Sequence, residues 1–157
     1  MPHLGRIGPV NACLACDLTA GVIPVPGGLI FETEGWRVEH CVGPLGVGTL
    51  VVKPKRHVLH LADITQDEAL EMGPLLKDTA TAVRDLTEAS QVYVCLWSHG
   101  PVHIHYVVQP ALPETIAEFG VYGPGLQAAM FARGGSVDPC LAAAFAERAR
   151  SWFAHRA

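Results

Sequence analysis

The sequence contains no long hydrophobic run, although half of its 157 residues are hydrophobic. A membrane-spanning helix needs about 18 or more consecutive apolar residues, so we expect no membrane segment and no membrane partner. Residues 1–10 include His3, Arg6 and two prolines, and no apolar segment follows them, so we also expect no targeting signal. These absences predict a cytoplasmic protein.

Charged residues are scarce, at 17% of the chain, and positive charge is not in excess, because the formal net charge is -4. Proteins that bind long nucleic acids usually carry surplus Lys and Arg, which neutralise the phosphates. The composition therefore argues against a long nucleic acid as partner. A small phosphorylated or nucleotide ligand remains compatible with it, because backbone N–H groups and a few side chains can hold one locally.

Cysteines are few and odd in number, at five. Secreted domains held by disulfides usually carry an even number of cysteines at regular spacings, so a disulfide framework is not indicated. Cys41, Cys95 and Cys140 lie among apolar neighbours, and we interpret them as small buried hydrophobic residues. Cys13 and Cys16 form a C-x-x-C pair.

The length fits one domain, and the hydrophobic pattern predicts both strands and helices. The Gly- and Pro-rich residues 1–27 are expected to be irregular, and 98–101 is short enough to connect a hairpin. In 114–132 the pattern predicts a short helix interrupted at 123–125. The other predicted elements are strands at 29–33, 36–39, 49–53, 91–97 and 102–109, and helices in 62–90 and 140–153.

The main helix, in 62–90, has a defined start. Thr65 and Glu68 have the spacing of a capping box. Apolar residues then recur at helical spacing and should face the core; they are Ala69, Met72, Leu76, Ala80, Val83 and Leu86. Pro74 cannot donate a hydrogen bond to the carbonyl of Leu70, so we expect a kink or a break there.

Two cysteines and two histidines have the residue types of a tetrahedral zinc site: Cys13, Cys16, His57 and His103. A closed set of four protein ligands predicts a structural zinc, because a catalytic zinc normally keeps one position open for water. A redox thiol pair at Cys13 and Cys16 is the alternative. The pair lies in an irregular segment and not where a strand opens a helix, which argues against that alternative.

His103 and His105 are two residues apart in a predicted strand, so both should project from the same face, followed by Val107. A neutral imidazole is a good nucleophile toward phosphorus if a backbone carbonyl holds its other ring nitrogen. The spacing alone does not distinguish a nucleophile from a second metal ligand or a solvated histidine. No role is visible for the other unassigned histidines, which are His3, His40, His60 and His155.

In combination and order, these motifs resemble those of the histidine triad (HIT) superfamily, which includes nucleotide hydrolases and the galactose-1-phosphate uridylyltransferase branch. The resemblance covers residues 13–110. It depends on Cys13-Leu14-Ala15-Cys16, Gly48–His57, Asp63–Glu68 and His103–Pro110. It implies an α+β fold in residues 1–112, in which a long helix packs on a HIT-like antiparallel sheet. Residues 113–157 would form a C-terminal helical extension packed on the same domain.

The resemblance also implies roles for individual residues. In zinc-containing members, the residues that match Cys13, Cys16, His57 and His103 hold the metal. The residue that matches His105 is the nucleophile, which forms a nucleotidyl-histidine intermediate. The expected activity is thus that of a nucleotide hydrolase or nucleotidyltransferase, and the expected assembly is a homodimer.

The sequence departs from the family pattern at several positions. Val107 stands where hydrolases have His and uridylyltransferases have Gln, and its side chain forms no hydrogen bonds. Thr49 replaces the His of a Gly-His pair, and Cys41 stands near the expected ribose-binding acid. The usual longer phosphate loop is replaced by a segment in which Ser98, His99 and Gly100 are the candidate substrate-binding residues.

Two interpretations therefore stay open besides the redox pair. The first is an enzyme in which His105 attacks phosphorus. The second is a non-catalytic, zinc-stabilised HIT-like binding or scaffold protein, which the substitutions at Thr49, Cys41 and Val107 favour.

Overall fold

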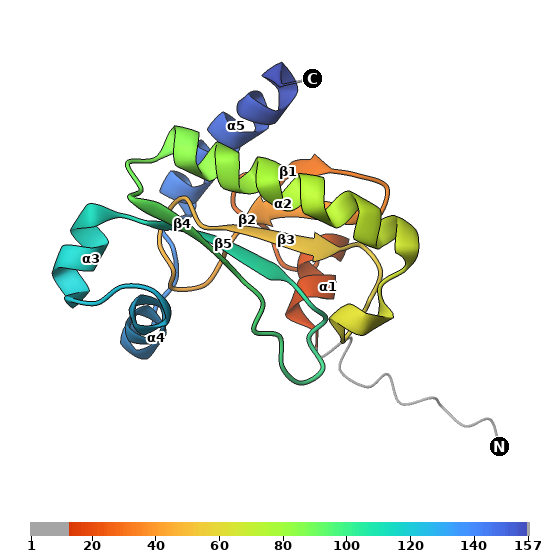
Figure 1. Ribbon diagram of the computed structural model, residues 1–157, viewed down its shortest axis with the longest axis horizontal. Helices are drawn as coiled ribbons and strands as arrows, with labels where there is room; N and C mark the ends of the chain where they lie inside the picture. Colours follow the sequence, from red (N-terminus) through yellow and green to blue (C-terminus); the bar gives the residue numbers. More distant parts are fainter. Residues whose placement is uncertain (1–12, 157) are drawn as a thin grey trace.

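The computed structural model describes residues 13–156, which form one sheet with helices on both faces (Figure 1). In chain order the elements are α1 (Leu14–Ala20), β1 (Leu29–Glu32), β2 (Trp36–His40), β3 (Leu50–Pro54), the short 3-10 helix η1 (Leu61–Asp63), α2 (Gln66–Leu86), β4 (Gln91–Cys95), β5 (Tyr106–Ala111), α3 (Pro113–Phe119), α4 (Pro124–Arg133) and α5 (Pro139–His155).

The sheet has five strands in the order β1-β2-β3-β5-β4, and every neighbouring pair is antiparallel. In the ladder between β3 and β5, Val51 lies opposite Val107 and Val52 opposite Tyr106. Successive residues project from opposite faces, so Val51 and Val107 share one face of the sheet and Val52 belongs to the other. The predicted α+β fold with a long helix packed on an antiparallel sheet is confirmed.

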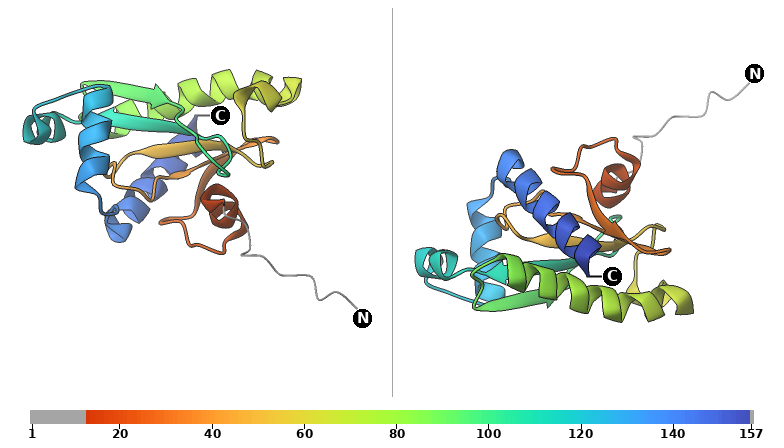
Figure 2. Two further views of the ribbon diagram at one scale, coloured as in Figure 1. Left: turned by 90° about the horizontal axis from the view of Figure 1, so that it is seen from below. Right: turned by 90° about the horizontal axis from the view of Figure 1, so that it is seen from above.

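Different helices cover the two faces of the sheet (Figure 2), and the apolar clusters beneath them differ in size. On one face, α2 and α5 pack together over an apolar core that contains Trp36, Val52 and Phe145, all buried. Burying one such side chain is worth about 1.5–3 kcal/mol, so this face supplies most of the apolar stabilisation. On the opposite face, α1 and α4 approach the sheet, and the apolar cluster there is smaller, with Leu45, Leu126 and Met130 at its centre.

The long helix α2 begins as the sequence predicts. The Thr65 hydroxyl accepts from the Glu68 N–H at 3.1 Å, and the Glu68 carboxylate accepts from the Thr65 N–H at 2.8 Å. Of the kink or break predicted at Pro74, the break is wrong, because α2 runs through this position. Pro74 and Leu70 both lie on the exposed side of α2, so water can satisfy the carbonyl that Pro74 leaves without a donor.

Part of the predicted irregular segment 1–27 is helical; residues 1–12 of that segment lie outside the described residues. Residues 14–20 form α1, with Cys13 at its N-cap and the left-handed Gly21 at its C-cap. The C-x-x-C pair therefore does open a helix, although a short one. The α1 helix is only seven residues long, so few residues carry its periodic pattern, and the glycines and prolines that follow it obscure the signal.

The predicted strand 102–109 is also displaced. β5 starts at Tyr106, so His103 and His105 lie in an extended segment just before it. The connection from β4 to β5 is 96–105, longer than the predicted turn at 98–101. A hydrogen bond from the Ile104 N–H to the Val58 carbonyl, 2.8 Å long, ties this segment to the loop after β3 and not to the β4 ladder.

The C-terminal part follows the predicted helices. The interrupted helix at 114–132 is resolved into α3 and α4, separated at Gly120 and Gly123, and α5 starts with Pro139 in its first turn. The prediction of a buried Cys140 is wrong, since this residue is exposed on α5, whereas Cys41 and Cys95 are partly buried. Among the described residues, no helix is both long and apolar enough to cross a membrane.

Candidate metal centre and adjoining pocket

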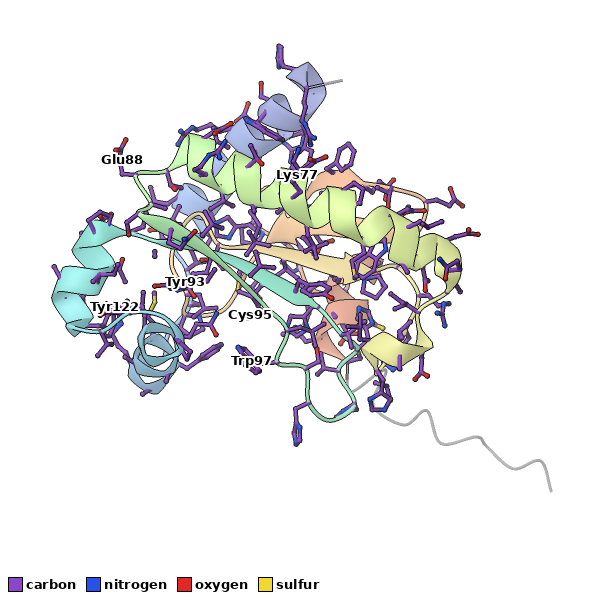
Figure 3. The ribbon with its side chains drawn as sticks, in the orientation of Figure 1. Lys77, Glu88, Tyr93, Cys95, Trp97 and Tyr122 are labelled. Carbon is purple, nitrogen blue, oxygen red and sulfur yellow. The ribbon has the colours of Figure 1, made fainter. Side chains whose placement is uncertain are left out.

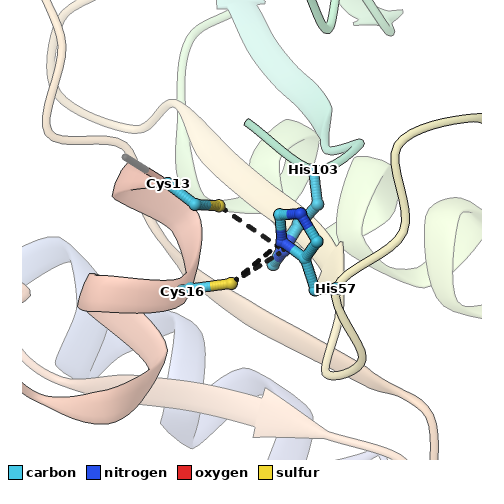
Figure 4. Close-up of side chains that lie close together, drawn as sticks. All are labelled: Cys13, Cys16, His57 and His103. Carbon is cyan, nitrogen blue, oxygen red and sulfur yellow. Dashed lines mark hydrogen bonds between the residues drawn. The ribbon is translucent and has the colours of Figure 1, made fainter. Parts of the chain in front are cut away.

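Four side chains from three separate parts of the chain converge at one end of the sheet (Figure 4). Cys13 and Cys16 come from the start of α1, His57 from the loop after β3, and His103 from the segment before β5. Their ligand atoms all lie within 4.8 Å of one another. The four residues that the sequence selected as a metal set are thus brought together by the fold.

The distances within this cluster fit the edges of a tetrahedron around one ion. Cys16 Sγ lies 3.2 Å from His57 Nδ1 and 3.3 Å from His103 Nδ1, and the two imidazole Nδ1 atoms are 3.3 Å apart. Cys13 Sγ is 3.8 Å from His103 Nδ1. Zinc bonds of about 2.0–2.3 Å to nitrogen and sulfur imply edges of about 3.3–3.8 Å. The residues present could therefore hold a metal ion of this size.

The protonation of the cluster also suits a cation. Burial lowers the pKa of His103 to about 4, and electrostatic interactions with His57 and Lys53 act in the same direction, so His103 is neutral at pH 7. Burial and the neighbouring Cys13 thiolate raise the pKa of Cys16 to about 11. Burial also opposes ionisation of Cys13, but backbone N–H groups of His103 and Cys16 outweigh it and lower the pKa of that thiol. A second thiolate here requires a positive partner, which a divalent ion supplies.

His105 is not part of the cluster and has a different environment. Its Nδ1 atom lies 3.2 Å from the carbonyl oxygen of His103 and 3.3 Å from Ser98 Oγ, and its backbone N–H donates to the same Ser98 oxygen at 3.2 Å. A carbonyl only accepts hydrogen bonds, so Nδ1 carries the proton and Nε2 keeps its lone pair. The partly buried His105 ring lines a pocket on the α1 and α4 face of the sheet.

Only one of the three residues expected to bind substrate reaches this region. Ser98 contacts His105, whereas His99 and Gly100 are exposed at the tip of the connection and do not line the pocket. Gly100 has φ +70°, which places it in a left-handed turn that directs the chain back toward His103. Its turn geometry explains this glycine without a ligand.

The pocket beside His105 has a volume of about 210 Å³ and is mainly apolar. Its apolar lining comes from α1, the loop after β2, the sheet and α4: Leu14, Ala15, Leu18, Val42, Leu45, Val51, Val102, Val107 and Phe131. Val107 and Cys41, two of the positions that depart from the family pattern, both face this space. Burial raises the pKa of Cys41, so it lines the pocket as a neutral thiol.

An ion pair that the sequence analysis missed lies at the floor of the pocket. Lys53 Nζ is 2.7 Å from a carboxylate oxygen of Glu39, and these side chains are only 1% and 3% exposed. The same ammonium donates to the Ala15 carbonyl between the two cysteines, at 2.9 Å. A lysine inside an apolar strand was the available signal, because alternation puts Lys53 on the same face as Val51.

His40, to which the sequence assigned no role, braces the loop that carries Cys41. Its Nδ1–H donates to the Cys41 carbonyl at 2.8 Å, and its Nε2 accepts from the Gly48 N–H at 3.0 Å. Burial lowers the pKa of His40, so the neutral ring that makes both bonds is the favoured form. The loop on the pocket rim is thus held at both ends by one imidazole.

Known proteins resemble this chain in structure, whereas the sequence comparisons find no match. No protein-family model and no curated protein sequence matches the chain. A zinc-bound histidine triad family protein from Mycobacterium smegmatis superposes with a TM-score of 0.66 at 20% identity, over 93% of this chain and 98% of that one. A Hit-like protein involved in cell-cycle regulation from Bartonella henselae gives 0.66 at 15% identity, over 92% and 99%.

A hypothetical histidine triad nucleotide-binding protein from Sulfolobus tokodaii strain7 gives a TM-score of 0.64 at 14% identity, over 91% of this chain and 93% of that one. These likenesses span almost the whole of each chain, including residues beyond 110. The chain therefore has the histidine triad fold.

Proposed function

We propose that this chain, which has the histidine triad fold, is a member of that superfamily that transfers or hydrolyses a nucleotidyl or phosphoryl group through His105. The observation that supports this proposal most directly is the environment of the His105 ring, which has one hydrogen-bonded nitrogen and lines a pocket. Its Nδ1 is held by the His103 carbonyl, at 3.2 Å, and its ring lines a pocket of about 210 Å³. An imidazole held in this way presents the lone pair of Nε2 to a substrate.

The proposed reaction has two steps. The lone pair of His105 Nε2 attacks phosphorus, an N–P bond forms, and the P–O bond to the leaving group breaks. Water or another acceptor hydroxyl then attacks the same phosphorus, the N–P bond breaks, and the proton of the attacking group passes to solvent. His105 is regenerated with Nδ1 still protonated, because its hydrogen bond to the His103 carbonyl is present throughout.

The missing third polar residue limits the rate in this scheme. Val107 faces the pocket at the position from which a His or Gln would contact the leaving group, and it offers no proton. Loss of one general acid costs about 10²–10⁴ in rate, so we expect a preference for leaving groups that depart without protonation.

We propose zinc as the ion at the cluster of Cys13, Cys16, His57 and His103. Two thiolates and two imidazoles in a tetrahedron are typical of structural zinc, and all four positions are taken by protein. The ion would link α1 to the segment before β5 and leave no site for a hydrolytic water. Its role is then to hold His103 in place, and with it the carbonyl that orients His105.

Non-catalytic binding is the second candidate function. The observation that favours it is the lining of the pocket, where Val107 and Cys41 replace groups that would contact a phosphate or a ribose. Such a protein would keep the zinc-stabilised fold and bind a small ligand without turnover.

Intact mass spectrometry separates the two candidates. The zinc-loaded protein is incubated with a panel of nucleotides and sugar nucleotides, and both turnover and protein mass are followed. A nucleotidyl adduct that is absent in His105→Ala and present in His155→Ala, a change of an exposed histidine on α5, supports the enzyme. No adduct and no turnover across the panel contradict the enzyme and support the binding protein.

We further propose that the chain forms a homodimer through β4, the last strand of the sheet on that side. Val94 on this strand is 43% exposed. Trp97 just after it and Tyr122 before α4, both labelled in Figure 3, are 71% and 75% exposed. Edge strands that remain unprotected tend to pair with another chain. Sedimentation should give a dimer for the wild type and a monomer for Val94→Lys; a monomeric wild type contradicts this proposal.

A further inference from the structure

We infer that the pocket beside His105 takes a compact phosphoryl compound whose other group is apolar, and that the Lys53 ammonium holds its negative charge. The inference rests on the proposed function of the same pocket, and it names both the class of substrate and a binding residue. Three observations support it: the charges of the side chains around Glu39 at the bottom of the pocket, the hydrogen bonds of Lys53, and the apolar residues that line the rest of the pocket.

The charges at the floor do not cancel. Glu39 is shared by two cations: one oxygen lies 2.7 Å from Lys53 Nζ, and the other lies 3.1 Å from Arg37 Nε. One carboxylate faces two positive groups, so the group as a whole carries a net positive charge. Lys53 is only 1% exposed, so solvent screens its charge little. An anion in the pocket would balance the net charge.

The ammonium also has an unused donor. A lysine ammonium has three N–H groups. Within the described residues, two acceptors contact Lys53 Nζ: the Ala15 carbonyl at 2.9 Å and the Glu39 carboxylate at 2.7 Å. Lys53 is one of the residues that line the pocket, so a ligand oxygen can accept the third hydrogen bond.

The register of the sheet places this donor beside the proposed nucleophile. Val51 pairs with Val107 and Val52 with Tyr106. The next residues, Lys53 and His105, lie just beyond the paired part of this ladder, and both line the pocket. A phosphoryl group in reach of His105 is therefore also beside Lys53.

The rest of the pocket suits an apolar group better than a sugar. Leu14, Leu18, Val42 and Phe131 contribute hydrocarbon to its walls. Glu39 is the carboxylate of the lining, and one of its oxygens is engaged by the Lys53 ammonium at 2.7 Å. The volume of about 210 Å³ is below the range of about 300–1,000 Å³ that is usual for pockets that bury larger ligands.

The probe for the test is benzylphosphonate, which combines an anion with a compact apolar ring and whose C–P bond does not react with a histidine nucleophile. Its binding to the zinc-loaded protein is measured by calorimetry and compared with benzyl alcohol, which lacks the anion, and with adenosine monophosphate, which carries a nucleoside. We expect benzylphosphonate to bind at least about tenfold more tightly than either, since hydrogen bonds to charged groups are worth about 1.5–3 kcal/mol.

Lys53→Met should weaken benzylphosphonate binding by about tenfold or more, because it removes the ammonium and keeps an unbranched apolar side chain. Lys55→Met is the matched control: Lys55 is 34% exposed, pairs with Glu32 and is outside the pocket lining, so binding should be unchanged. Circular dichroism and zinc content establish that each variant is folded. A purely structural Lys53 predicts a lower melting temperature with unchanged affinity in the folded fraction.

Equal affinity in folded Lys53→Met and wild type overturns the inference, as does binding of benzyl alcohol or adenosine monophosphate that matches the phosphonate. The comparison of the three probes uses the wild type alone and decides the matter if Lys53→Met does not fold. His105→Ala should still bind benzylphosphonate. If benzylphosphonate binds through Lys53 but reactive esters give no histidine adduct, only the proposed catalysis is contradicted. If an adduct forms but binding does not depend on Lys53, only this inference is contradicted.

Discussion

The Nδ1 atom of His105 lies 3.2 Å from the main-chain carbonyl oxygen of His103, whose own ring faces Cys13, Cys16 and His57. One residue thus contributes its imidazole to the cluster of two cysteines and two histidines and its carbonyl to the orientation of the neighbouring histidine. Any change that loosens the cluster should also loosen the His105 ring. Predictions on metal content and on activity are therefore linked.

Cys16→Ser should remove most of the bound zinc. Four ligands share an apparent zinc binding free energy of about 10–16 kcal/mol, so loss of one thiolate should weaken binding by about a hundredfold or more. Elemental analysis of the purified protein measures this, with about one zinc per chain expected for the wild type. Cys140→Ser, at an exposed position outside the cluster, should keep its zinc. A Cys16→Ser protein with full zinc content would refute the assignment.

Ser98→Ala should slow turnover without loss of zinc. The hydroxyl accepts from the His105 N–H at 3.2 Å and lies 3.3 Å from its Nδ1, so its removal frees both the backbone and the ring. The loss of one neutral hydrogen bond is worth about 0.5–1.5 kcal/mol, which corresponds to a rate about 2- to 10-fold lower. Steady-state kinetics and metal analysis check this. Ser136→Ala, an exposed serine before α5, should behave as wild type.

Val107→His should raise the rate with poor leaving groups. The side chain faces the pocket that His105 lines, so an imidazole there can deliver a proton to the departing oxygen. We expect a gain of about 10-fold or more with alkyl leaving groups and little change with nitrophenyl ones. Leu141→His places a histidine at an exposed position of α5 and should leave both rates unchanged. Equal effects on both substrate types would contradict leaving-group protonation.

His40 should make the folded protein sensitive to mild acid. Burial lowers the pKa of His40 below its usual value of about 6.5, so the unfolded state binds the proton more readily than the folded state. The stability from the neutral ring is complete above about pH 6.5 and is lost as the pH falls below it toward the folded pKa. Denaturant titrations of the zinc-loaded protein between pH 7.5 and about 5 should show this loss in wild type and a smaller one in His40→Asn. Parallel pH profiles of the two proteins would contradict it.

Local signals in the sequence predicted local structure well. The Thr65 and Glu68 spacing identified the start of α2, because a capping box involves only residues within one turn. The break expected at Pro74 did not occur, because the cost of a proline depends on whether the lost carbonyl partner faces water, and that depends on packing. The α1 helix was missed because seven residues are too few for a periodic pattern.

The start of β5 at Tyr106 could not be read from alternation. From Val102 to Tyr106 apolar residues alternate with histidines, yet only residues from Tyr106 onward pair with β4 and β3. Before that point the backbone of Ile104 bonds to Val58, a partner 46 positions earlier that no local pattern indicates. Extended conformation was predictable, but the partner of that extended segment was not.

The amino-acid sequence by itself determined which residue types are present for metal and phosphorus chemistry, the order in which they occur and the capped start of the long helix. Tertiary structure alone decided that Cys16 meets His103 across a separation of 87 residues, that His105 stays outside the cluster, and that Lys53 is buried beside Glu39. The physical reason is that short spacings are set by the geometry of one turn or strand. Contacts between distant segments exist only after strands β3 and β5 pair and α1 packs against them.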